Sequence, residues 1–66
     1  MEAVDIETLN RIQVEYLEMP DMKLTLRQAR RLWSLQRDDC ERALTLLVER
    51  GFLVQTSDGG FLRRGR

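Results

Sequence analysis

The residues that decide the fold are 25–52, TLRQARRLWSLQRDDCERALTLLVERGF. The first four, TLRQ, have the S/T-x-x-Q pattern of a capping box. In that motif the Thr25 hydroxyl accepts a hydrogen bond from the Gln28 amide, and the Gln28 side chain accepts one from the Thr25 amide. We therefore predict a helix over about 26–33. Its inward-facing positions are expected to be Leu26, Ala29 and either Leu32 or Trp33.

A second helix is predicted over about 37–50, after a turn at 34–36. Its apolar residues follow i, i+3, i+4, i+7, i+8 spacing, which places them on one core-facing stripe: Cys40, Ala43, Leu44, Leu47 and Val48. Two starts are open: a weak cap at Gln36, or a later start in which Asp38 and Glu41 form a capping box. Gly51 fits the left-handed position that ends a helix, and Phe52 supplies the apolar residue that closes such a motif.

The segment before this stretch predicts a supporting helix over about 5–18. Asp5 is a suitable N-cap, and Pro20 requires the helix to end before it. The apolar positions at helical spacing are Ile6, Leu9, Ile12, Tyr16 and Leu17. Val14, Met19 and Met22 are surplus apolar residues that could contact a second copy.

The segment after the stretch predicts a β-hairpin over about 52–64, with its turn in SDGG. A two-residue turn at Asp58-Gly59 pairs Thr56 with Phe61, whereas a three-residue turn with a bulge pairs Gln55 with Phe61. Both registers are open. Residues 19–23 are expected to be a loop.

The size and composition predict one domain over 1–66 that is not an enzyme. The chain has no histidine and one cysteine, so we expect no metal site, no cofactor, no intramolecular disulfide and no small-molecule substrate. We expect a cytoplasmic protein, because a lone thiol is typical of a reducing compartment. The sequence also shows neither the basic start and apolar run of a signal peptide nor an apolar segment long enough to span a membrane.

The charges are unevenly distributed although the net charge is zero. Residues 1–22 carry six acids and one base, whereas residues 23–66 carry ten bases and five acids. This asymmetry indicates either a side that faces a polyanion or mutual attraction between the two halves.

The order of elements resembles that of a winged helix-turn-helix domain, mainly α with a small β-hairpin and three helices. LTLRQARRLWSLQRDDCERALTLLVERGFL resembles a pattern common in small bacterial transcriptional-regulator-like proteins, and SDGGFLRR resembles a short wing. The chain departs from the pattern at Arg30, where a small residue is usual, and at Ser34, where glycine is usual. The resemblance implies DNA binding and transcription regulation.

In DNA-binding members of this superfamily the second helix of the motif enters the major groove, the first crosses the phosphate backbone, and the wing lies alongside. The candidate DNA-binding residues are therefore Arg27, Arg30, Arg31, Gln36, Arg37, Arg42, Thr45, Arg63 and Arg64. Asp38, Asp39 and Glu41 lie among them and would repel phosphates. They favour the second hypothesis, a protein-interaction module that docks a partner or a second copy without binding DNA.

Overall fold

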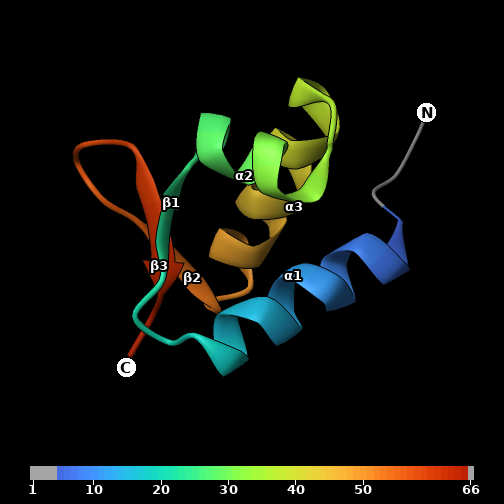
Figure 1. Ribbon diagram of the computed structural model, residues 1–66. Helices are drawn as coiled ribbons and strands as arrows, with labels where there is room; N and C mark the ends of the chain where they lie inside the picture. Colours follow the sequence, from blue (N-terminus) through green and yellow to red (C-terminus); the bar gives the residue numbers. More distant parts are fainter. Residues whose placement is uncertain (1–4, 66) are drawn as a thin grey trace.

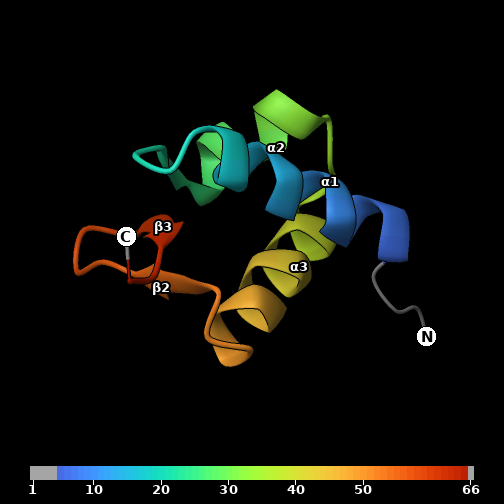
Figure 2. The same cartoon turned by 90° about the horizontal axis from the view of Figure 1, so that it is seen from below.

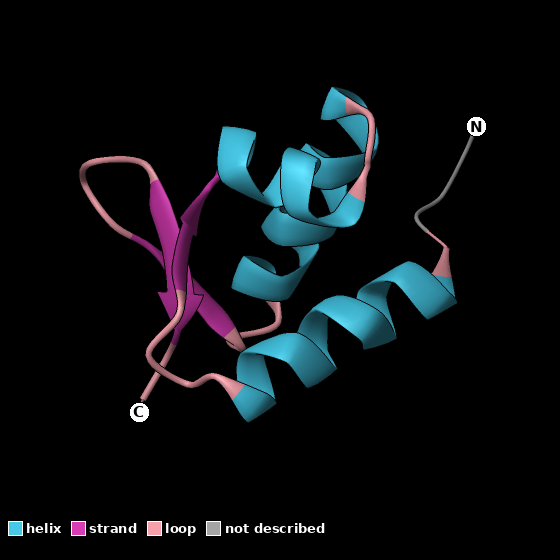
Figure 3. Ribbon diagram, viewed as in Figure 1, coloured by secondary structure: helices cyan, strands magenta, loops and turns pink. Residues whose placement is uncertain are grey.

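The computed structural model describes residues 5–65 and contains three helices and three short strands (Figures 1 and 3). In chain order the elements are α1 (Ile6–Glu18), β1 (Lys23–Thr25), α2 (Leu26–Trp33), α3 (Arg37–Glu49), β2 (Leu53–Gln55) and β3 (Gly60–Arg63). The sheet stands at one end of the helices, and Figures 1 and 2 together show α1 packed across the α2–α3 pair. No helix in residues 5–65 is long and apolar enough to cross a membrane.

The sheet has three antiparallel strands in the order β1-β3-β2, so the predicted two-stranded hairpin is incomplete. The expectation of a loop up to Lys23 is wrong, because Lys23 begins β1 and pairs with Leu62 of β3. Three residues carry too little pattern to predict a strand, and β1 exists through its pairing with β3. The hairpin adopts the bulged alternative, since Gln55 pairs with Phe61, and Gly59 has a φ of 90°.

The helix starts follow from local side-chain hydrogen bonds. The capping box of α2 is confirmed: the Gln28 amide donates to the Thr25 hydroxyl at 3.2 Å, and the Thr25 amide donates to Gln28 Oε1 at 2.9 Å. The Glu7 amide donates to Asp5 Oδ1 at 3.3 Å and caps α1. α3 begins at Arg37 after Gln36, whose side chain makes no cap bond, so the later start at Asp38 is wrong.

One apolar core joins all three helices to the sheet. Its buried residues are Leu9, Ile12, Tyr16, Ala29, Trp33, Cys40, Ala43, Leu44, Leu47, Leu53 and Phe61. Of the two alternatives in α2, Trp33 is buried and Leu32 is exposed. On α1 the predicted apolar face is narrower than expected, because Ile6 and Leu17 are 63% and 53% exposed. A surface helix of a 66-residue chain buries only the stripe that meets its neighbours.

Candidate functional site

A basic hollow lies on α2 and the turn that follows it. It has a volume of about 310 Å³ and is lined by Arg27, Arg30, Arg31 and Leu35. The three arginines are exposed, and α2 carries no acidic residue. Within residues 5–65 no carboxylate forms an ion pair with any of them. These guanidinium groups are therefore available to an anion from outside the chain.

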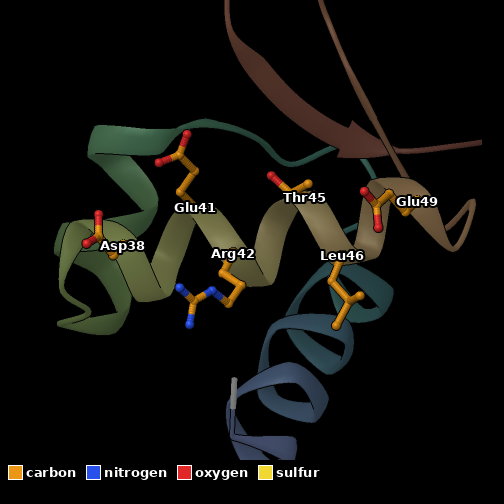
Figure 4. A pocket seen from close by; sticks show the side chains of 6 residues that line it. All are labelled: Asp38, Glu41, Arg42, Thr45, Leu46 and Glu49. Carbon is orange, nitrogen blue, oxygen red and sulfur yellow. The ribbon is translucent and has the colours of Figure 1, made fainter. Parts of the chain in front are cut away.

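An acidic hollow of about 400 Å³ lies on the outer face of α3 (Figure 4). Its lining residues follow helical spacing: Asp38, Glu41, Arg42, Thr45, Leu46 and Glu49. Arg42 and Leu46 extend from the side of α3 on which α1 lies, whereas Glu41 and Thr45 extend from the opposite side. Three carboxylates against one guanidinium make this hollow negative, which favours a cationic ligand.

The candidate DNA-binding residues of α3 are all at the surface. Gln36, Arg37, Arg42 and Thr45 are exposed, as the sequence predicted, but so are the neighbouring acids. The structure adds Glu49, which the sequence reasoning did not include. Its position four residues after Thr45 and seven after Arg42 was the available signal, because those spacings return to the same helix face.

The two wing arginines differ in accessibility. Arg63 is half-buried, and its guanidinium carbon lies 5.6 Å from the centre of the Phe52 ring. Its Nε is buried and has no hydrogen-bond partner within the described part of the chain. Arg64 is exposed, and its amide donates to the Phe52 carbonyl at 2.9 Å. Arg64 is therefore the more accessible cation of the two.

A polar network closes the tip of the hairpin against β1. Lys23 Nζ lies 2.9 Å from Asp58 Oδ2, and Asp58 also accepts hydrogen bonds from the Thr56 hydroxyl and the Gly60 amide. The Thr56 hydrogen bond, followed by the one from Lys23, lowers the pKa of Asp58 to about 2. Lys23 is thus paired with a carboxylate of this chain, unlike the three arginines of α2.

Among residues 5–65 the structure brings the predicted cations together at the α2 hollow. The α3 candidates lie among carboxylates, and the wing contributes mainly Arg64. No group of three or more histidine, cysteine, aspartate or glutamate side chains in residues 5–65 is arranged to hold a metal ion. Comparison with protein-family models, curated proteins and solved structures finds no match to this chain.

Proposed function

We propose that this protein binds double-stranded DNA through backbone phosphates, with α2 as the main contact. The observation that carries the proposal is the α2 hollow, where Arg27, Arg30 and Arg31 are exposed and have no carboxylate partner in residues 5–65. Guanidinium groups match phosphate oxygens in charge and bidentate geometry. Arg64 supplies a further exposed cation beyond the sheet.

The arrangement of elements is consistent with a winged helix-turn-helix. Two helices follow one another across a three-residue turn, and an antiparallel sheet flanks them. In such a domain α3 would enter the major groove, but the carboxylates of Asp38, Glu41 and Glu49 oppose close approach to phosphates. We therefore propose binding with little dependence on base sequence.

A salt titration tests this proposal. Duplex DNA of mixed sequence is titrated with the protein at several salt concentrations, and the slope of log affinity against log salt is measured. Each neutralised phosphate contributes about −0.9 to the slope, so the three arginines of α2 together with Arg64 predict a slope of roughly −3.6. Absence of binding at low salt would contradict the proposal.

The matched variants are Arg27→Ala/Arg31→Ala on α2 and Arg11→Ala on α1, where the arginine is also exposed. The α2 pair should make the slope shallower by roughly 1.8, and the α1 change should leave it unaltered. If the α2 pair keeps the wild-type slope, the phosphates are bound elsewhere.

A second candidate function is protein docking on α3, and the acidic hollow is the observation that favours it. Asp38, Glu41 and Glu49 are exposed along α3 and outnumber the one arginine of this lining, Arg42. A cationic protein surface would complement this face, whereas DNA would not.

A further inference from the structure

The two hollows have complementary linings. The α2 hollow combines three arginines with half-buried Leu35, and the α3 hollow combines three carboxylates and one arginine, Arg42, with half-buried Leu46. The chain therefore carries, on consecutive helices, a cationic surface and an anionic surface.

We propose that these two surfaces bind one another between copies of this chain, with α2 of one copy against α3 of the next. Opposite charges on facing surfaces are the pattern expected of a specific contact between proteins. The inference deepens the docking function proposed for α3 by naming its occupant. It does not depend on DNA binding.

The alternative pairing of copies through α1 is opposed by charge. α1 leaves Val14 and Leu17 about half exposed, which offers apolar area for a contact. Its cap and helix, however, carry four acids (Asp5, Glu7, Glu15 and Glu18) and one base (Arg11). Two such helices would repel each other, whereas α2 against α3 brings opposite charges together.

The contact between copies uses the α2 arginines, Arg27, Arg30 and Arg31, that the proposed DNA complex also uses. Self-association and DNA binding should therefore exclude one another at α2. A contact between two single helix faces is smaller than a standard interface of about 1,600 Å², so we expect weak, reversible association that salt disrupts.

Sedimentation without DNA tests the inference. The wild-type chain should associate at about 20 mM salt and dissociate at about 500 mM salt. Arg27→Glu/Arg31→Glu makes both surfaces acidic, and Glu41→Arg/Glu49→Arg makes both basic. Each pair should weaken association at least tenfold.

The decisive variant combines all four substitutions, which exchanges the two charges and keeps the net charge at zero. It should associate within about threefold of the wild type, because the complementarity is restored. Its control combines Arg27→Glu/Arg31→Glu with Glu7→Gln/Glu18→Gln on α1, which leaves α1 without a net positive charge. Both hollows are acidic in this control, so it should remain monomeric.

Circular dichroism confirms that each variant is folded before it is compared. A wild-type chain that stays monomeric at low salt overturns the inference. The inference is also overturned if the variant with all four substitutions is folded but does not associate. It is overturned as well if the control variant associates as strongly as that four-substitution variant. Because DNA is absent, these outcomes leave the proposed DNA function to its own titration.

Discussion

The Tyr16 hydroxyl donates a hydrogen bond of 2.8 Å to the Phe61 carbonyl, and both residues are buried although 45 positions apart in the chain. The bond joins α1 to β3, the central strand of the sheet. The Tyr16 ring also lies 6.3 Å from Trp33 and 6.5 Å from Phe52, measured between ring centroids. Tyr16 therefore fixes the placement of α1 against both the helix pair and the sheet.

Replacing Tyr16 by phenylalanine should lower the free energy of unfolding by about 1–2 kcal/mol. The ring is kept, but the hydrogen bond to the buried Phe61 carbonyl is lost. The measurement is the urea midpoint, with Val14→Ala as a control on an exposed position of the same helix. Equal midpoints for Tyr16→Phe and the wild type would show that the bond does not stabilise the fold.

Stability should decline in alkaline solution because of the same side chain. Burial raises the pKa of Tyr16 above its ordinary value of 10.0, and the neighbouring Cys40 raises this pKa further. The folded chain then holds the phenol proton more tightly than the unfolded chain. The stabilisation is complete below pH 10.0 and is lost as pH rises above it.

The chain has one tyrosine, so its ionisation can be followed directly by ultraviolet absorbance. Native protein should form phenolate only well above pH 10.0, or on unfolding. Tyr16→Phe should show a smaller alkaline loss of stability. Phenolate at the ordinary pKa in folded protein would contradict the buried hydrogen bond.

Stability should also decline in acid through the hairpin tip. The pKa of Asp58 is lowered from 3.8 to about 2, so its stabilisation is present above pH 3.8 and is lost as pH falls through 2. Asp58→Asn should flatten this part of the pH profile, measured by the urea midpoint. Glu18→Gln, an exposed change on α1, should retain the wild-type decline.

Ser34→Gly should stabilise the protein by about 1 kcal/mol. Ser34 ends α2 in the left-handed conformation, with φ 54° and ψ 45°, which is strained for a residue with a β-carbon. The reciprocal test is Gly51→Ala, where φ is 83° and an added β-carbon meets nothing within 4 Å. It should cost about 1 kcal/mol from backbone strain alone. Thermal melting checks both predictions: the melting temperature should rise for Ser34→Gly and fall for Gly51→Ala.

The two wing arginines should separate stability from DNA binding. Arg63→Ala removes the contact with Phe52 and should destabilise the fold by about 0.5–1 kcal/mol, with little effect on the salt slope of DNA binding. Arg64→Ala should leave stability unchanged and make the slope shallower by about 0.9. The opposite pattern would identify Arg63 as the phosphate contact.

The helices were predictable from the sequence because their signals are local. The capping box at Thr25 and the apolar stripe from Cys40 each lie within one helix and its cap, and both appear as predicted. Ser34 adopts the left-handed conformation at the position where the winged helix-turn-helix pattern that the sequence resembles usually has glycine. The basic residues of α2 were also identifiable, since three arginines within five positions of one helix must lie close together.

The remaining features depend on contacts between distant residues. Strand β1 forms because Lys23–Thr25 meets Gly60–Leu62, and no short-range pattern marks that pairing. The accessibility of Arg63 is set by its position over Phe52, and the charge of Lys23 is neutralised by Asp58, 35 positions away. The sequence by itself determined where α1 and α2 begin and which face of α3 is buried, because capping and periodicity act within a few residues. Only the tertiary structure decided which cations remain available, because packing and ion pairing join segments far apart in the chain.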